Sequence, residues 1–290
     1  MIGVVRGVAP TSLTAARNRR LWAAVIIFNQ HGSGSQELTN ALEGYDVKDV
    51  KKTLYLGQNK KCAYCERRSD FSGNPIEHYR PKAKAWRHER GQAELTHTSH
   101  YWWLTWTWTN LLFACGRCNN PRHKANYFQV LPGTACAPPT SPVYGPTPPL
   151  LATTAGETPM LINPADTNTD PITLLWWEPV DTTIPPRLWV WEPRWSDERG
   201  RITSETLRLG DLAADVARHV SKDIVPRVYE VRRLAAGGQS TLAQDKWNEL
   251  LADKLLDLEE DFREATWKAL ELLVSPIERT AWSLASPVRP

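Results

Sequence analysis

Helical patterns of hydrophobic and polar residues mark both ends of the chain. Near the N-terminus they predict a helix over residues 14–30, a Gly/Ser break at 32–35 and a weaker helical segment that continues to about residue 54. From Ser204 onward the pattern is again helical. Its clearest part is one apolar stripe at three- and four-residue steps, beneath an acidic face, made of Leu250, Leu251, Leu255, Leu258, Phe262, Ala265 and Ala269.

The middle of the chain is less regular. Residues 160–205 contain five Trp in short β-prone runs separated by Pro, which allow either a small sheet or irregular packing. Residues 132–159 include eight Pro with many Thr, Ala and Gly, a composition typical of a linker or long surface loop. We therefore divide the chain into a helical segment at 1–60, a central core at 61–131, the Pro-rich segment and a Trp-rich, helical region at 160–290.

Composition excludes several classes of protein. Of the 290 residues, 41% are hydrophobic and 23% are charged, which is ordinary for a globular protein and excludes a disordered or fibrous chain. The longest apolar run, Leu21–Phe28, has eight residues, whereas a membrane span needs about 20. Arg19 and Arg20 precede that run, but no small-residue cleavage pattern follows it. We expect a cytoplasmic protein without a membrane partner, with this run in a short core helix.

Charge is unevenly distributed. The net charge is +3, yet residues 60–130 contain twelve Lys/Arg and five Asp/Glu, so this segment carries +7 and the remainder −4. Residues 241–273 have the opposite bias, with nine acidic and four basic residues. A basic central segment suits contact with phosphate, although a solvated surface would give the same count.

The five cysteines indicate a metal site. Cys62 and Cys65 form one Cys-x-x-Cys pair, Cys115 and Cys118 form another, and Cys136 has no assigned role. Two such turns present four thiolates to one ion, which suits zinc better than a redox pair or unrelated thiols. Since four sulfurs close the coordination sphere, this zinc would be structural and any chemistry would lie elsewhere.

Between and beyond the cysteine pairs the chain carries residues suited to phosphodiester hydrolysis. Glu77-His78 lies between the pairs, Asn110 precedes the second pair and Asn119 follows it. A neutral imidazole can deprotonate water near neutral pH, and a hard cation held by oxygen ligands can offset charge on the phosphate. Each residue alone is more often surface decoration or a strand end, so the prediction depends on their order between the two pairs.

These residues resemble the HNH nuclease motif, in the variant clamped by two Cys-x-x-Cys turns. The stretches Cys62–Glu66, Glu77–Lys82, Tyr101–Leu104 and Trp108–Leu112, with Cys118-Asn119, are similar to the PtuB family, the HNH effector subunits of Septu anti-phage systems. Leu161–Pro164 and Thr206–Leu209 extend the likeness to about residues 50–220. Gln129, Gly210 and the Pro-rich insertion depart from that family's pattern.

The resemblance implies an α+β fold, mainly helical, with a ββα-metal nuclease core clamped by zinc. It implies His78 as general base, with Glu77 and Asn119 as ligands of a catalytic Mg²⁺ or Mn²⁺ and His123 as a competing ligand. Asn110 would brace the base, and Asn120-Pro121 would begin the helix of the core. Arg80, Lys82 and Lys124 would face the substrate phosphate.

The resemblance also implies partners: a DNA or RNA substrate and an SMC/ABC-like ATPase subunit. The acidic segment 241–273 is a candidate docking element for that ATPase. Three alternatives stay open: a restriction-type HNH nuclease acting alone, a zinc-ribbon module that binds without cutting, and a scaffolding subunit. The Trp102, Trp103, Trp106 and Trp108 cluster could stack nucleobases, but its spacing favours core packing.

Overall fold

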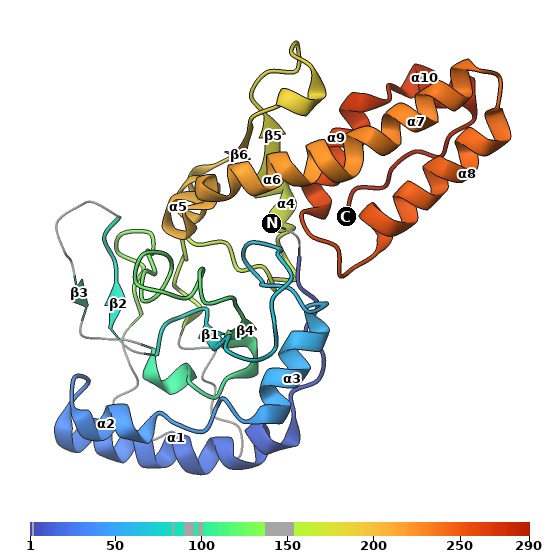
Figure 1. Ribbon diagram of the computed structural model, residues 1–290. Coiled ribbons are helices and arrows are strands. Elements are labelled where there is room, and N and C mark those ends of the chain that lie inside the picture. Colours follow the sequence, from blue (N-terminus) through green and yellow to red (C-terminus); the bar gives the residue numbers. More distant parts are fainter. Residues whose placement is uncertain (2, 83, 90–95, 98–100, 137–153) are drawn as a thin grey trace.

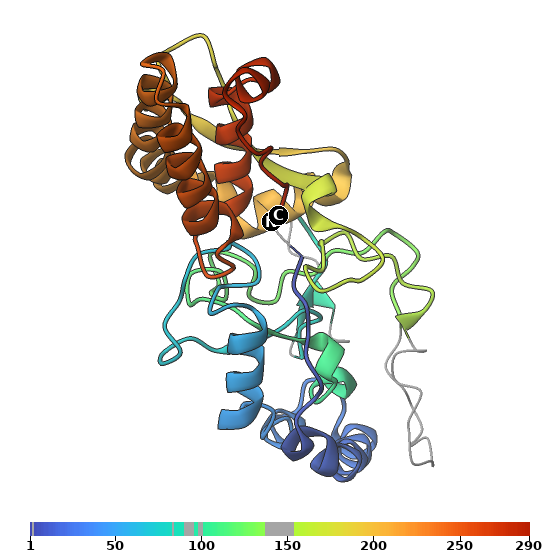
Figure 2. The ribbon, with the colours of Figure 1, turned by 90° about the vertical axis from the view of Figure 1, so that its right-hand side faces the viewer.

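The computed structural model describes residues 1–290 except 2, 83, 90–95, 98–100 and 137–153. The chain is α+β and forms two lobes that meet near the middle of the molecule (Figures 1 and 2). The first lobe, drawn in blue to green, contains the predicted central core. The second, drawn in yellow to red, contains the Trp-rich and helical region.

Three helices flank the first lobe: α1 (Thr11–His31), α2 (Gln36–Ala41) and α3 (Lys48–Gly57). They confirm the predicted N-terminal helix and the break after it, where Gly32 has a φ of 82° and the Ser35 side chain accepts the Leu38 N–H to cap α2. Their apolar residues, such as Leu21, Val50 and Leu54, are buried against the central core.

The central core is built on a short antiparallel pair of strands, β1 (Ile76–His78) and β4 (Leu111–Phe113). Glu77 lies opposite Leu112 and His78 opposite Leu111, and every residue of both strands is buried. A second two-stranded sheet pairs β2 (Ala85–Trp86) with β3 (Thr96–His97). Because β1 ends at His78, the Glu-His pair lies where the strand stops.

The tryptophans before β4 form part of the core. The short helical turns η1 (Trp102–Leu104) and η2 (Trp108–Asn110) lead into β4. The side chains of Trp102, Trp103 and Trp106 are at most 1% exposed. Core packing is therefore confirmed for these three, which are not available to stack bases. Trp108 is half-buried and its indole N–H donates to the carbonyl of Gly7 (2.8 Å).

The second lobe begins with a hairpin. The Trp-rich region forms a small antiparallel sheet of β5 (Leu175–Pro179) and β6 (Trp191–Trp195), preceded by α4 (Pro171–Leu174). The remaining helices pack behind it, with α7 and α8 side by side (Figure 1). They are α5 (Glu198–Leu207), α6 (Ala213–His219), α7 (Val225–Ala236), α8 (Ser240–Leu251), α9 (Arg263–Leu273) and α10 (Pro276–Trp282).

The stripe predicted from residue 250 to 269 is not one helix. A π-helical turn at Ala252–Leu256 follows α8, and Phe262 takes a left-handed conformation (φ 48°) before α9 begins. Leu258 falls in the break and is 50% exposed, whereas the other residues of the stripe are buried. A helical pattern in the sequence thus continues across a break in the structure.

The break contacts the first lobe beside the first cysteine pair. Glu259 forms ion pairs with Lys60 (2.6 Å) and Arg68 (3.0 Å), and Arg67 pairs with Asp215 of α6 (3.1 Å). Part of the positive charge predicted for phosphate is therefore matched by acidic residues of the same chain.

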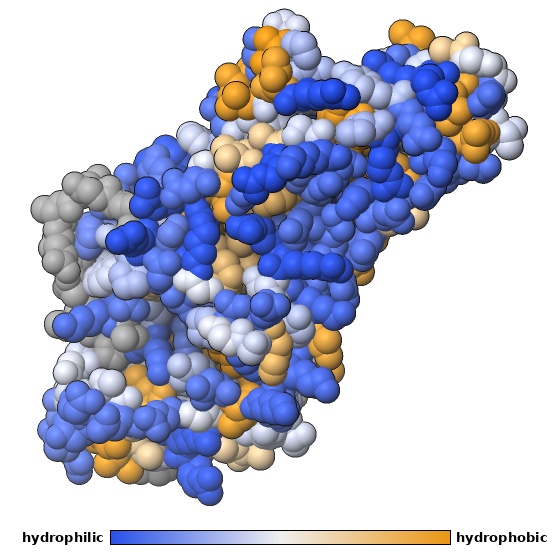
Figure 3. Space-filling view, viewed as in Figure 1, coloured by the Kyte–Doolittle hydropathy of each residue, from blue (hydrophilic) through white to orange (hydrophobic). Residues whose placement is uncertain are grey.

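The face shown in Figure 3 is mostly hydrophilic, with an apolar group at the tip of the β5–β6 hairpin. Val180, Leu188 and Val190 contribute to it and are each more than half exposed. Among the described residues, we find no helix with the length and apolar character needed to cross a bilayer.

Candidate functional site

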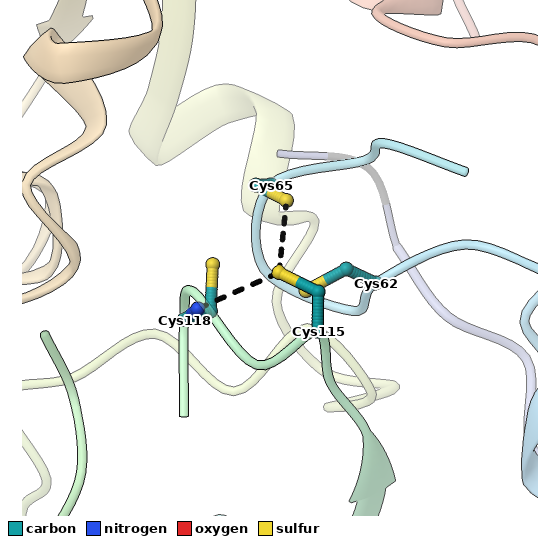
Figure 4. Close-up of side chains that lie close together, drawn as sticks. All are labelled: Cys62, Cys65, Cys115 and Cys118. Atoms are coloured by element: carbon teal, nitrogen blue, oxygen red, sulfur yellow. Dashed lines mark hydrogen bonds between the residues drawn. The ribbon is translucent and has the colours of Figure 1, made fainter. Parts of the chain in front are cut away.

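The four paired cysteines converge from two turns. Cys62 and Cys65 follow α3, and Cys115 and Cys118 follow β4. A backbone hydrogen bond from Ala63 to the carbonyl of Phe113 (3.1 Å) holds the first turn against β4. The four Sγ atoms lie within 4.8 Å of one another, and their side chains point toward a common centre (Figure 4).

This cluster fits zinc. A tetrahedral ion with Zn–S bonds of about 2.3 Å places its sulfurs about 3.8 Å apart, and the Sγ atoms of Cys65 and Cys115 are 3.8 Å apart. Hydrogen bonds from the neighbouring thiols lower the pKa of Cys115, and the same contacts raise the pKa values of Cys65 and Cys118. Packed so closely, the sulfurs cannot all ionise without a compensating cation. The cluster can therefore hold a structural zinc ion.

Glu77 and Lys124 form a buried ion pair. The Lys124 ammonium contacts the Glu77 carboxylate and also donates to the carbonyl of His78 (2.9 Å). Lys124 is fully buried and Glu77 is 4% exposed. Burial raises the pKa of Glu77, and the charge of Lys124 opposes that effect. Sequence analysis placed both residues at one site, and the structure brings them into contact.

His78 is held in one orientation. Its Nε2 lies 3.1 Å from the carbonyl oxygen of Thr105, an acceptor, so Nε2 carries the proton and Nδ1 is left as the basic atom. Burial and the charges of Lys82 and Lys124 lower the pKa of His78 to about 3. The imidazole is therefore neutral at physiological pH, the form that can accept a proton.

Asn110 ties the end of β1 to the turn before β4. Its Oδ1 accepts the N–H of Arg80 (2.8 Å), and its Nδ2 donates to the carbonyl of Arg80 (3.0 Å). Its own carbonyl accepts the N–H of Tyr79 (2.9 Å). The side chain is 3% exposed, so Asn110 braces the backbone immediately after His78 and does not face solvent.

The region after the second cysteine pair differs from expectation. Residues 114–136 form turns and bends with no helix, so the helix predicted at Asn120-Pro121 was wrong. Asn120 uses its side-chain oxygen to accept the N–H of Arg122 (2.8 Å) and to contact Nδ1 of His123 (3.0 Å), and Ala125 has a φ of 35°. The bond from the Arg122 N–H to Asn120 is of the kind that caps a helix, but turns follow it here.

Asn119 occupies the turn itself, and its N–H donates to the carbonyl of Cys115 (3.0 Å). Among the hydrogen bonds and ion pairs of the described residues, none joins Asn119 to Glu77 or His78.

The other predicted phosphate ligands also have partners within the chain. The Arg80 guanidinium pairs with Glu157 (2.8 Å) and lies over the ring of Phe128. The Lys82 ammonium donates to the carbonyl of Leu42 (3.0 Å). Including Lys124, each of the three predicted cations is engaged by a carboxylate or a carbonyl of the protein.

The chemical type of the candidate donor atoms supports a catalytic divalent metal more strongly than their arrangement in the structure does. The Glu77 carboxylate and the Asn119 amide are oxygen donors of the kind that Mg²⁺ and Mn²⁺ take, with water completing the shell. However, the Glu77 carboxylate is bound to Lys124. Within the described residues, the four cysteines are the one cluster of three or more His, Cys, Asp or Glu side chains that could hold a metal.

Two residues in contact with the site escaped sequence analysis. The ring of Tyr45 packs edge-on against the imidazole of His78, with centroids 4.5 Å apart. Glu157 is a buried partner of Arg80 and accepts the hydroxyl of Tyr101 (2.5 Å) and the thiol of Cys136 (3.3 Å). Tyr45 lies in a short connection and Glu157 in the Pro-rich segment, and neither has a motif that would single it out.

Comparison with known proteins supports one family. No protein-family model and no solved structure matches the chain. The chain is 44% identical over 89 residues to a protein from Bacillus mycoides (strain KBAB4) described as Septu protein PtuB. The matched stretch covers 30% of this chain and 29% of that relative, so less than two thirds of the relative is spanned. The resemblance to the PtuB family expected from the sequence is therefore confirmed for a segment of 89 residues.

Proposed function

We propose that this protein is a metal-dependent HNH endonuclease, the effector of a bacterial anti-phage system that acts with an SMC/ABC-like ATPase. The observation that carries the proposal is the position of Glu77 and His78. They are the last two residues of β1, which pairs with β4. The four cysteines come from the segment before β1 and the turn after β4, and they converge on one point. The similarity to Septu protein PtuB supports the defence role.

In the proposed reaction His78 removes a proton from the attacking water at Nδ1, because Nε2 is committed to the Thr105 carbonyl. Asn110 holds the backbone beyond His78 in place and thereby orients the imidazole. Glu77 and Asn119 would hold the divalent metal, which would supply positive charge at the phosphate, with His123 as the less favoured ligand. Lys124, Arg80 and Lys82 would contact the phosphate after leaving their present partners.

The ATPase partner needs a docking surface, for which the acidic segment 241–273 is the candidate. Ion pairs within the chain restrict which acidic residues of this segment are available. Of the acidic segment 241–273, Glu259 is engaged with Lys60 and Arg68 of the same chain. On α8, Glu249 pairs with Lys246 (2.8 Å) and Arg227 (3.7 Å), whereas no ion pair among the described residues engages the exposed Asp245, so the docking hypothesis is confined to the face of α8 around Asp245.

The test is cleavage of plasmid DNA and of total tRNA, each with Mg²⁺, Mn²⁺ or EDTA. Wild-type protein is compared with His78→Ala, and both are assayed alone and with the ATPase encoded beside the gene. We expect metal-dependent cutting by the wild type and a loss of about 10²- to 10⁴-fold in the variant, the usual contribution of a general base. Equal cutting by both proteins would exclude His78 as the base.

Absence of cutting by either protein, with and without the ATPase, would favour a zinc-ribbon binding module. Gel-shift binding of the same nucleic acids by the wild type would then measure that activity directly.

A further inference from the structure

The connection between α2 and α3, residues 42–47, lies over the candidate base. We call this segment the lid. Its Tyr45 packs edge-on against His78, with an angle of 70° between the ring planes. The predicted reactive side chains beneath are almost inaccessible, since Glu77, His78 and Asn110 are 4%, 6% and 3% exposed. At 6% exposure, His78 is out of reach of a phosphate group in this conformation.

Hydrogen bonds to backbone carbonyls hold the lid down. The indole N–H of Trp106 donates to the carbonyl of Glu43 (2.9 Å), and the Arg20 guanidinium donates to the carbonyl of Gly44. Gly44 has a φ of 75°, a backbone conformation that L side chains rarely adopt, so glycine is favoured where the lid turns. Arg20 belongs to α1 and Trp106 lies in the segment before β4. The lid is therefore bound to two separate parts of the first lobe.

The lid also engages one of the predicted phosphate ligands. Lys82 donates to the Leu42 carbonyl, and its ammonium lies 4.3 Å from the centre of the Tyr45 ring. The exposed carboxylates of Glu43 and Asp46 act favourably on the same ammonium. The lid thus presents carbonyl oxygen, a π face and negative charge to Lys82, which are the interactions that a nucleic-acid strand would offer.

The lid is less deeply buried than the helices that flank it. Of its six residues Leu42 alone is fully buried, while Tyr45 and Val47 are half-buried against the core. The helices on either side, α2 and α3, each bury their own apolar residues, Leu38 in the first and Val50 and Leu54 in the second.

We propose that residues 42–47 form an autoinhibitory lid that occludes His78 and occupies Lys82, and that this lid must be displaced before nucleic acid enters the site. This inference rests on the proposed nuclease function, since it names the regulation of that site. A closed lid explains how a cell could hold such an enzyme without damage to its own nucleic acid.

The test measures accessibility and activity separately. Diethyl pyrocarbonate acylates neutral, accessible imidazole nitrogens, and mass spectrometry reports the rate at each histidine. The exposed His31 of α1 provides an internal reference in the same molecule. In wild type we expect His78 to react at least about tenfold more slowly than His31 because it reacts only through lid opening. In Tyr45→Ala the rate at His78 should rise about tenfold or more, with His31 unchanged.

Cleavage is then measured with Mg²⁺ or Mn²⁺. Tyr45→Ala should cut about tenfold or more faster than wild type, since the competent fraction limits the rate, and Tyr45→Ala with His78→Ala should be inactive. Tyr229→Ala removes a half-buried tyrosine from α7 and is the matched control, expected to behave as wild type. If Tyr45→Ala does not fold, Trp106→Phe removes the hydrogen bond to Glu43 and keeps an aromatic ring in the core.

The outcomes separate the two proposals. Equal reactivity of His78 and His31 in wild type, or no gain at His78 in the lid variants, would overturn the lid. A gain in accessibility without cleavage by any variant, with and without the ATPase, would support the lid and reject the nuclease. Cleavage by wild type as fast as by Tyr45→Ala would support the nuclease and reject inhibition by the lid.

Discussion

The cysteine cluster lies beside the short sheet that carries the Glu-His pair, and the two sites differ in how their charges are satisfied. The four sulfurs converge on one point and stand at zinc-like separations, so the cluster is arranged for an ion from outside the chain. The charged groups around His78 instead have partners in the same chain. Glu77 forms an ion pair with Lys124, and Lys82 donates to the Leu42 carbonyl of the lid. The comparison suggests that the structural site is assembled in advance, whereas the candidate reactive site is kept closed.

The largest expected effect comes from the cluster. Cys62→Ser should abolish cooperative folding of the first lobe, since zinc binding in such sites contributes on the order of 10 kcal/mol to folding. Circular dichroism melting and zinc content by mass spectrometry measure the result. Cys136→Ser is the control, because a hydroxyl can replace the thiol that donates to Glu157. An unchanged melting temperature in Cys62→Ser would show that the cluster does not stabilise the lobe.

The next largest effect is expected at the buried ion pair of Glu77 and Lys124. Lys124→Met leaves the Glu77 carboxylate buried without its cation and should lower the free energy of unfolding by about 3–5 kcal/mol. The double variant with Glu77→Gln should recover most of that loss, which urea denaturation can measure as a double-mutant cycle. Additive losses in the double variant would mean that the two side chains are not coupled.

The third prediction concerns Glu264, a buried carboxylate that, unlike Glu77, does not form an ion pair with a lysine among the described residues. Glu264 of α9 accepts the backbone N–H of Trp177 (2.6 Å), and burial raises its pKa to about 7 from an ordinary 4.5. Between these pH values the folded state binds more protons than the unfolded state, so the free energy of unfolding falls as pH rises. The loss should reach about 3 kcal/mol above pH 7. Glu264→Gln should flatten this part of the curve, and a slope equal to that of wild type would contradict the assignment.

The smallest effect is expected between the lobes. Glu259→Ala removes ion pairs to Lys60 and Arg68, whose side chains are 41% and 54% exposed. Because exposed pairs are screened by solvent and salt, we expect a loss below about 1 kcal/mol, further reduced in 0.5 M salt. A loss of several kcal/mol at high salt would show that the joint depends on packing at Glu259 and not on charge.

Much of the architecture could be read from local pattern. The N-terminal helix, the break at residues 32–35 and the helical end of the chain follow from the spacing of apolar residues, which is set within a few turns of helix. The convergence of Cys62, Cys65, Cys115 and Cys118 followed from the chemistry of the residues, because four thiols in two tight turns have few other stable arrangements. The roles of His78, Glu77 and Asn119 remain predictions.

Other features were not set by the local pattern. Asn120-Pro121 reads as a helix start, but turns follow it, and the Asn120 side chain bonds to Arg117 and Arg122 within three residues. The apolar stripe through Leu258 reads as one helix, but the chain breaks there, and Glu259 in the break pairs with the distant Lys60 and Arg68. In both places helix propensity alone did not decide the structure.

The sequence by itself determined that the four cysteines would gather, and it named candidate reactive residues whose roles stay predictions. Only the tertiary structure decided that Tyr45 would cover His78, that Leu42 would accept from Lys82 and that Glu157 would bind Arg80. The physical reason is that residue type fixes what a side chain can donate or accept, whereas its partner depends on which distant segments the core brings beside it. For a buried charge that partner decides whether the group is available to a substrate.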